Sequence, residues 1–249
     1  MPECIHGFDE GLCDVCFPRT PVEPVRAARP ASPRVTRTAT RAAAAPPAPA
    51  SLKLPGRRVH HVTHVRTLES IALDGALRAD ATPDVDLSSA TTRELRASAT
   101  VPDGRAVASF VAFFLSPDAS RWQELREGAA GAHWSDAARA AKPTDFVILG
   151  VPVDALGDDV VFADADAAAV DTRFAAGIEA GTAGLRRLHA RDPEFSDAEL
   201  LAADPVPLSA VAAITVANDR VRDAVRAVFA DAGVAVPRIA VYPAAFAVD

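Results

Sequence analysis

The sequence contains only three cysteines, all before position 17, and it lacks any run of about 18 apolar residues. Without such a run no transmembrane helix is expected, and we predict no association with a membrane. The first residues do not combine a basic segment with an apolar one, so no secretory signal is expected either. We therefore expect a cytoplasmic protein, in a compartment where thiols stay reduced.

Several nucleotide-binding and catalytic motifs are also missing. There is no Walker A motif, no G-x-G-x-x-G after a predicted strand and no G-x-S-x-G. The nearest glycine cluster, GIEAGTAG at 177–184, has the wrong spacing, and no strand is predicted before it. These absences argue against a P-loop enzyme, a Rossmann dehydrogenase and an α/β-hydrolase.

The charge is distributed unevenly along the chain. Nine basic residues and one acid lie between Arg19 and Arg58, whereas the chain as a whole carries a net charge of −7. Residues 19–56 are rich in proline, alanine and arginine and offer little large apolar surface, so they predict a disordered linker. Its arginines serve solubility or contact nucleic-acid phosphates, and because no aromatic residues accompany them solubility is the favoured interpretation.

The cysteines lie in residues 1–18, where Cys4, His6, Cys13 and Cys16 form the pattern C-x-H-x6-C-x2-C. Two thiolates in a C-x2-C pair can share one metal through a tight turn, and Cys3His is a closed tetrahedral set for structural zinc. A disulfide, a redox pair and an accidental cluster are the alternatives. We favour a zinc-knuckle-like module, which at this size would be unfolded without its metal.

Residues 57–249 alternate between strand and helix patterns, so an α+β domain is expected there. The tract ADADAAAVD at 163–171 is assigned to a solvated helix surface, with a loop as the alternative for its first aspartates. Strands are predicted at 58–65, 109–115, 145–153, 159–164, 209–218 and 238–242, and helices at 67–77, 88–99, from 116 through 125 and at 219–233.

A few polar residues stand in or beside these elements. His61 and Thr63 share one face of the first strand and His64 faces the other way. Arg96 lies on a predicted helix, and Glu199 comes directly before a hydrophobic strand. On residue type alone, an edge strand with polar decoration is the favoured interpretation for the histidines and a solvated helix face for Arg96. Glu199 fits a surface position and a catalytic one equally.

Five segments in order resemble the DarT family of DNA ADP-ribosyltransferase toxins, and together they cover roughly residues 57–249. They are RVHHVTHVRTLESIALDGAL, TTRELRASATVPDG, SFVAFFLSP, FVILGVPVDAL with VVFADADA, and DAELLAADPVPLSAVAAITVAN. The resemblance implies an ADP-ribosyltransferase-like mixed sheet with surrounding helices. It also implies an enzyme that cleaves NAD and places ADP-ribose on a base, usually thymine in single-stranded DNA.

By position, the resemblance gives Arg96 the role of the family's essential arginine and Glu199 that of its catalytic glutamate. His61, Thr63, His64 and Phe114, together with Arg96, are expected in the NAD site. A carboxylate suits this chemistry because it stabilises positive charge on the ribose and accepts a proton. An arginine can hold a diphosphate through paired hydrogen bonds.

The chain departs from the family pattern at three places. Phe114 stands where the family has a tyrosine, and residues 118–121 read Asp-Ala-Ser-Arg where it usually has Arg-Ser-Pro-Met. After His64-Val65, where the family often has Asp-Asn, this chain has Arg66-Thr67. Transfer to RNA or protein, or a catalytically inactive nucleotide- or nucleic-acid-binding module, are therefore alternatives to the DNA enzyme. A macrodomain antitoxin is a possible partner by the same resemblance.

Overall fold

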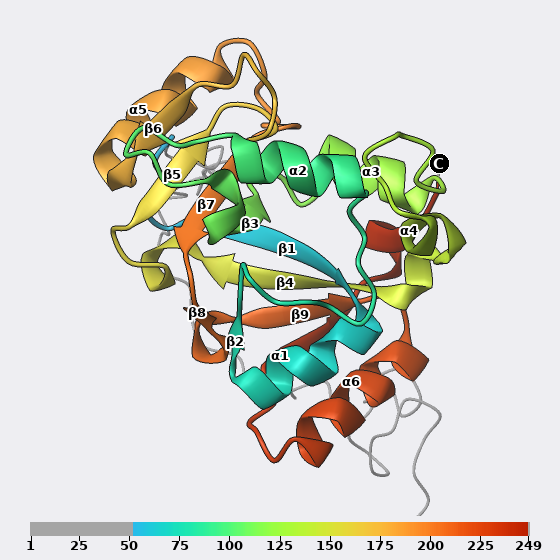
Figure 1. Ribbon diagram of the computed structural model, residues 1–249. Coiled ribbons are helices and arrows are strands. Elements are labelled where there is room, and N and C mark those ends of the chain that lie inside the picture. The colour runs from blue at the N-terminus through green and yellow to red at the C-terminus, as the bar shows by residue number, and fades with distance from the viewer. Residues whose placement is uncertain (1–51, 249) are drawn as a thin grey trace, which may run out of the picture. The chain divides into compact units, whose positions relative to one another are not determined.

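The computed structural model describes residues 52–248, in which helices pack on a large mixed β-sheet (Figure 1). The strands are β1 (Arg58–His64), β2 (Ala76–Leu77), β3 (Phe110–Phe114), β4 (Phe146–Pro152), β5 (Val160–Ala163), β6 (Phe174–Ala176), β7 (Glu199–Ala203), β8 (Val206–Pro207), β9 (Ala213–Val216) and β10 (Arg238–Val241). The helices are α1 (Leu68–Asp74), α2 (Ala90–Ser98), α3 (Ser120–Arg126), α4 (Asp136–Ala140), α5 (Gly177–His189) and α6 (Asp219–Asp231). This architecture confirms the expected α+β mixed sheet.

Eight strands form one sheet in the order β10-β9-β4-β1-β3-β7-β5-β6, and β2 pairs with β8 in a small second sheet. β9 and β10 are parallel, and the other neighbouring strands are antiparallel. β1 pairs with β4 along its whole length, from Arg58 opposite Pro152 to His64 opposite Phe146. The first strand of the domain therefore lies inside the sheet rather than at its edge.

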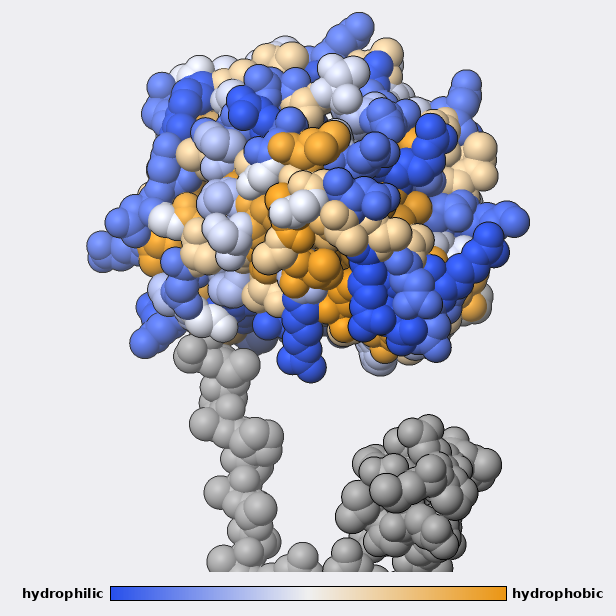
Figure 2. Space-filling view, turned by 90° about the horizontal axis from the view of Figure 1, so that it is seen from below, coloured by the Kyte–Doolittle hydropathy of each residue, from blue (hydrophilic) through white to orange (hydrophobic). Residues whose placement is uncertain are grey.

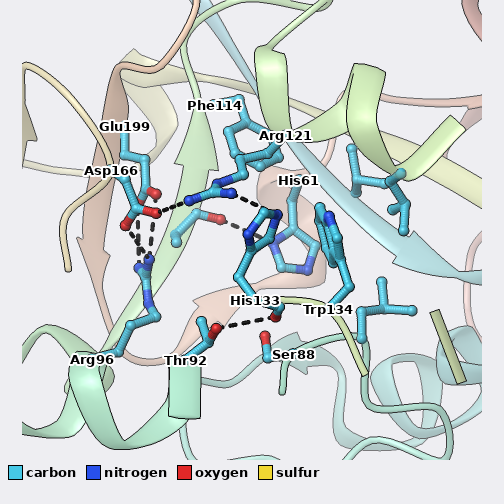
Figure 3. Close-up of a pocket in the computed structure, with 14 residues that line it drawn as sticks. His61, Ser88, Thr92, Arg96, Phe114, Arg121, His133, Trp134, Asp166 and Glu199 are labelled. Carbon is cyan, nitrogen blue, oxygen red and sulfur yellow. Dashed lines mark hydrogen bonds and ion pairs between the residues drawn. The ribbon is translucent and has the colours of Figure 1, made fainter. Parts of the chain in front are cut away.

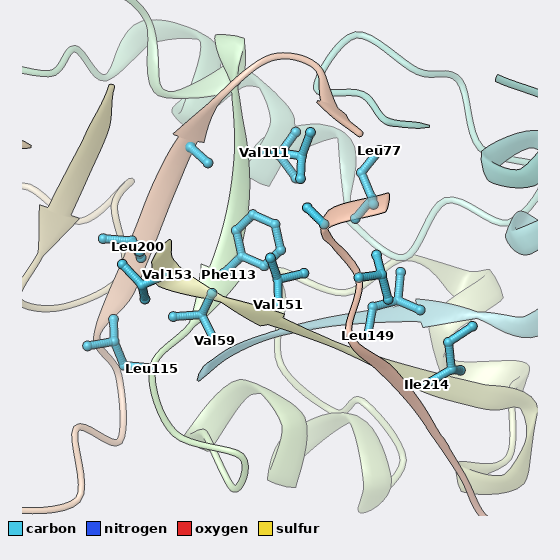
Figure 4. Packing of buried hydrophobic residues seen from close by; sticks show 14 of the residues in the cluster. Val59, Leu77, Val111, Phe113, Leu115, Leu149, Val151, Val153, Leu200 and Ile214 are labelled. Atoms are coloured by element: carbon cyan, nitrogen blue, oxygen red, sulfur yellow. The ribbon is translucent and has the colours of Figure 1, made fainter. Parts of the chain in front are cut away.

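The main hydrophobic core fills one face of this sheet. Alternate residues of β3 and β7, such as Val111, Phe113 and Leu200, point into it together with Leu149 of β4 (Figure 4). α1 and α6 contribute to the same core and contact each other. Figure 2 shows the molecule from below the view of Figure 1, with apolar side chains interspersed among polar ones.

The intervening residues of the same strands point to the opposite face, where two smaller clusters form. One contains Trp122 and Leu125 of α3 packed against Phe146 and Ile148 of β4. The other surrounds Phe110 of β3 and includes residues of β5 and β7. Phe114 and Glu199 also belong to this set of intervening positions, but neither of them belongs to a cluster.

β1 and β3 pair at a single position, His60 opposite Phe114. Beyond it, the backbone carbonyl of Ala112 accepts a hydrogen bond from the ring of His61, with 3.0 Å between Nδ1 and the oxygen. The side chain of His61 thus takes the place of a backbone amide of β1 as the hydrogen-bond partner of this β3 carbonyl.

Several expectations from the sequence need correction. The tract 163–171 is not a helix: β5 ends at Ala163 and a loop of turns leads to β6. The helix expected from Ser116-Pro117 begins only at Ser120. Packing also begins before residue 57, because Leu54, which we assigned to the linker, is fully buried. Its backbone amide donates to the hydroxyl of Thr182 on α5, 3.2 Å away.

The glycine cluster at 177–184 forms the first half of α5, and β6 precedes it, contrary to expectation. A Cβ added at Gly184 would lie 2.7 Å from Cδ1 of Phe162, and one at Gly181 would lie 2.6 Å from Cδ1 of Leu54. These two glycines therefore let α5 approach β5 and the start of the domain closely. None of the helices within residues 52–248 has the length and apolar composition needed to cross a membrane.

Gly184→Ala tests this close packing. Helix propensity alone would stabilise the protein by about 1 kcal/mol, whereas overpacking against the buried Phe162 ring costs about 1–3 kcal/mol. We expect a net decrease in the free energy of unfolding, measured by urea denaturation. In the double variant with Phe162→Leu, part of the cost of the alanine should disappear. A stabilised Gly184→Ala protein would contradict the packing argument.

Candidate active site

A cavity of about 210 Å³ opens on the face of the sheet that carries the two smaller clusters, between them (Figure 3). Its apolar lining includes Val62 of β1, Ala112 of β3 and Leu125 of α3. The charged and imidazole side chains that line it come from β1, α2, α3, β7 and two loops: His61, Arg96, Arg121, His133, Asp166 and Glu199.

Glu199 is the buried carboxylate of this cavity. It begins β7, opposite Phe114 of β3 and Ala163 of β5, and only 4% of its surface is exposed. Arg96, from the last turn of α2, binds both of its oxygens: Nη2 lies 3.0 Å from Oε2 and Nη1 lies 3.3 Å from Oε1. Such a paired geometry is what allows two buried charges to stay ionised. Burial alone would lower the pKa of Arg96, but the charge and the hydrogen bonds of Glu199, together with the charge of Asp166, outweigh burial and raise the pKa.

Asp166, in the loop between β5 and β6, is a second carboxylate beside Arg96, with 3.8 Å between Oδ1 and Nη1. Its other oxygen accepts a hydrogen bond of 2.6 Å from Arg121 of α3. Burial would raise the pKa of Asp166, but the amide of Ala168 and the two arginines lower it. The carboxyl group is therefore charged at neutral pH.

His133 completes the polar side of the cavity. Its ring contacts the guanidinium of Arg121, and its backbone carbonyl accepts a hydrogen bond of 3.0 Å from the hydroxyl of Thr92 on α2. Trp134 follows it and donates from Nε1 to Glu124, 3.2 Å away. The loop between α3 and α4 is thereby tied to α2 and to α3.

Sequence reasoning did not identify Arg121, His133 or Asp166. Arg121 and Asp166 were noted only as a departure from a family pattern and as part of an alanine-rich tract. No local pattern distinguishes them, because their proximity arises from the packing of α3 against the loop after β5. The rarity of histidine, with six in the chain, was the only signal that could have pointed to His133.

The residues expected on β1 lie in different places. His61 lines the cavity, and burial lowers its pKa, more than the carbonyl of Ala112 raises it. Because a carbonyl only accepts, Nδ1 of this neutral ring carries the proton and Nε2 is left as an acceptor. Thr63 is buried and lines an adjoining cavity.

His64 lines neither cavity. Its ring packs edge-on against Phe146, 5.8 Å between centroids, and Nδ1 accepts from the amide of Arg66. It faces away from His61, as the strand alternation predicts, so the structure does not bring it to the cavity that His61 lines, and its expected place in an NAD site stays a prediction. Phe114, by contrast, lies in the first cavity next to Glu199.

The adjoining cavity has a volume of about 310 Å³ and is lined mainly by residues of α1, β2 and the segment 78–88. It shares His61, Val62, Leu87, Ser88 and Arg96 with the first cavity, so Arg96 lies where the two meet. Thr67 lines this cavity, and its buried hydroxyl has no hydrogen-bond partner within the described part of the chain. A ligand with two polar halves could occupy both cavities at once.

This arrangement suits chemistry in which positive charge develops on a substrate. A carboxylate buried in a mostly apolar cavity interacts strongly with a cation because little water screens it. The same oxygens can hold a hydroxyl or accept a proton. Arg96 would have to exchange some of its bonds to Glu199 for bonds to the substrate.

Within residues 52–248 no group of three His, Cys, Asp or Glu side chains is placed to hold a metal ion. Cys4, His6, Cys13 and Cys16 lie outside the described residues. The structural zinc site therefore stays a prediction.

Comparison with known proteins agrees with the geometry. The family model described as "ssDNA thymidine ADP-ribosyltransferase, DarT" matches residues 60–247. No curated protein matches the sequence.

Solved structures share the fold. The DarT of Thermus sp. 2.9 in complex with ADP-ribosylated ssDNA aligns with a TM-score of 0.64 and 20% identity, over 76% of this chain and 95% of that one. The same protein in complex with NAD+ gives 0.61 and 20%, over 76% and 96%. Thermosipho africanus DarTG in complex with ADP-ribose gives 0.59 and 17%, over 76% of this chain and 51% of that one.

The buried ion pair makes a prediction about stability. In Arg96→Met the carboxylate of Glu199 loses its partner, so we expect the free energy of unfolding at pH 7 to fall by about 3–5 kcal/mol. Adding Glu199→Gln should recover part of this loss because the unpaired charge is gone.

Arg93→Met is the matched control. It lies on the same helix and pairs with Asp86, but both side chains are largely exposed. We expect its cost to be below about 1 kcal/mol. Urea denaturation of the four proteins measures the difference, and equal costs for Arg93→Met and Arg96→Met would refute a stabilising role of the buried pair.

Proposed function

The chain belongs to the DarT family of ssDNA thymidine ADP-ribosyltransferases, and we propose that it uses NAD as the donor and Glu199 as the catalytic carboxylate. The observation that carries this assignment is the burial of Glu199 at the cavity, 3.0 Å from Arg96. The relatives bound to NAD+ and to ADP-ribosylated ssDNA support the donor and the acceptor.

NAD fits the two cavities in shape and in chemistry. It has two nucleoside halves joined by a diphosphate, and the cavities meet at Arg96. In the proposed orientation the nicotinamide and its ribose occupy the first cavity, with Glu199, and the adenosine occupies the second. Thr67 would then gain a partner for its buried hydroxyl. Arg96 would bind the diphosphate with the paired geometry that it now uses for Glu199.

The reaction breaks the bond between C1′ of the ribose and the nicotinamide nitrogen. Both bonding electrons leave with nicotinamide, which becomes neutral, and positive charge develops on the ribose ring. We propose that Glu199 stabilises this charge while holding a ribose hydroxyl. The ring nitrogen of thymine that bears a proton then bonds to C1′ and transfers that proton to Glu199. The products are nicotinamide, the ADP-ribosylated base and one proton.

His61 and Phe114 would shape the donor site. Phe114 presents an apolar ring beside Glu199, which keeps water away from the reacting carbon. The neutral ring of His61 offers Nε2 as an acceptor for a substrate hydroxyl or amide. The proposed roles of both residues follow from their place in the first cavity.

The proposal also covers the acceptor of the ADP-ribose and the partners of the protein. Thymine in single-stranded DNA is the proposed acceptor, and RNA is the alternative that a test must separate. The Thermosipho relative is named DarTG, and the match spans about half of that chain. We propose a macrodomain antitoxin as the partner of this protein, from the resemblance alone. The zinc module and the basic linker would then add contacts to nucleic acid.

Glu199→Gln tests the mechanism. The wild-type protein should add one ADP-ribose to a thymine-containing single-stranded oligonucleotide in the presence of NAD, seen by mass spectrometry of the products. The variant loses the charge but keeps the volume of the side chain, so we expect its rate to fall by about 100-fold or more.

Glu194→Gln, an exposed change five residues away, is the control and should keep full activity. Oligonucleotides without thymine, duplex DNA and RNA run in parallel to identify the acceptor. An unmodified oligonucleotide with the wild-type protein would argue against the proposed reaction, and an active Glu199→Gln protein against the role of this carboxylate.

A further inference from the structure

Two arginines approach opposite oxygens of the same carboxylate at the rim of the first cavity. Arg121 Nη2 lies 2.6 Å from Oδ2 of Asp166, and Arg96 Nη1 lies 3.8 Å from Oδ1 (Figure 3). Asp166 is thus bonded closely to Arg121 and only loosely to Arg96. Arg96 in turn has a second carboxylate, Glu199, on both of its terminal nitrogens.

The carboxylate of Asp166 is fixed by its own loop. Oδ1 accepts a hydrogen bond of 2.9 Å from the amide of Ala168, and the backbone carbonyl of Asp166 accepts one of 2.6 Å from the hydroxyl of Thr172. The side chain is three-quarters buried. Asp166 therefore cannot move far from Arg96 when a ligand enters.

Arg121 is held in place from the other side. It contacts Glu124, one helical turn further along α3, with 3.3 Å between Nη1 and Oε2, and its guanidinium also meets the ring of His133. Glu124 is half-exposed, and its carboxylate also contacts the ring of His133 and accepts a hydrogen bond from Nε1 of Trp134. The guanidinium of Arg121 therefore spans the rim and ends on Asp166.

This placement matters for the binding of an anionic substrate. A diphosphate that binds Arg96 must approach a site that already contains the two negative charges of Glu199 and Asp166. If Asp166 were unpaired, it would repel the diphosphate and compete for Arg96, since both effects act over a few ångströms in a partly buried site. Arg121 supplies the positive charge that cancels Asp166.

We propose that Arg121 is a positioning residue for NAD binding, which neutralises Asp166 so that Arg96 is available to the diphosphate. The proposal rests on the proposed function, because it assigns the diphosphate of NAD to Arg96. Arg121 itself need not touch the substrate, and it acts through Asp166.

The test compares KM for NAD and kcat at a saturating concentration of thymine-containing oligonucleotide. In Arg121→Gln, KM for NAD should rise about tenfold while kcat stays within about twofold, because the lost binding energy is shared equally by the ground state and the transition state. Arg121→Lys keeps the charge and should raise KM less than about threefold.

The double variant Arg121→Gln/Asp166→Asn gives the decisive comparison. It removes both charges, so KM should return to within about twofold of the wild-type value. A merely structural ion pair would not restore KM in this way. Asp166→Asn alone should leave KM unchanged or lower, which also tests the proposal if Arg121→Gln fails to fold; thermal melting of every variant reports on folding.

Each other result contradicts the proposal. An unchanged KM in Arg121→Gln would mean that the neutralisation is irrelevant to binding. A raised KM that the second substitution does not restore would mean that Arg121 binds the substrate directly, and a raised KM in Asp166→Asn that Asp166 itself assists binding. If the wild-type protein neither modifies the oligonucleotide nor releases nicotinamide from NAD, it is the proposed function that fails.

Discussion

The burial of a carboxylate at the start of β7 is the constraint on which the site depends. Such a group is stable in a charged form only if a cation meets it with good geometry, and Arg96 provides that cation from a helix that contains no buried residue of its own. α2 is held beside the cavity by this ion pair, by polar contacts to His133 and by its contacts with the turn Val107–Ser109. The residue that secures the helix is therefore also the residue proposed to receive the substrate's diphosphate.

The two faces of the sheet differ, and this difference allows the domain to be stable although it contains a buried ion pair beside a cavity. One face carries a large continuous core, to which α1 and α6 contribute, and this core supplies most of the apolar burial. The opposite face is covered by two separate clusters, and the cavity lies between them. Because β1 and β3 pair at one position only, His61 can reach into the space where they separate. Polar groups are concentrated where the packing is interrupted.

Local sequence patterns were sufficient for the elements that bury one face. The strands at β1, β3, β4, β5, β9 and β10 and the helices α1, α2 and α6 lie close to their expected positions. The patterns failed where composition was misleading. The alanine-rich tract around Asp166 has the composition of a helix but forms a loop. The side chain of Asp166 bonds to an amide of its own turn and to arginines that are distant in the sequence. Arg96 and Glu199 could be identified only through order and spacing along the chain, because nothing local to either residue reveals that they meet. Arg121 had no such signal.

The order of strands in the sheet has a consequence for the newly made protein. Arg96 and Glu199 are 103 residues apart, and the carboxylate is positioned only when β7 pairs with β3 and β5. β3 is made long before β7, so a growing chain that still lacks β7 has one strand that borders the cavity but not the carboxylate proposed for catalysis. The activity proposed for Glu199 therefore requires the sheet to have closed as far as β7, and a chain terminated before residue 199 would lack it.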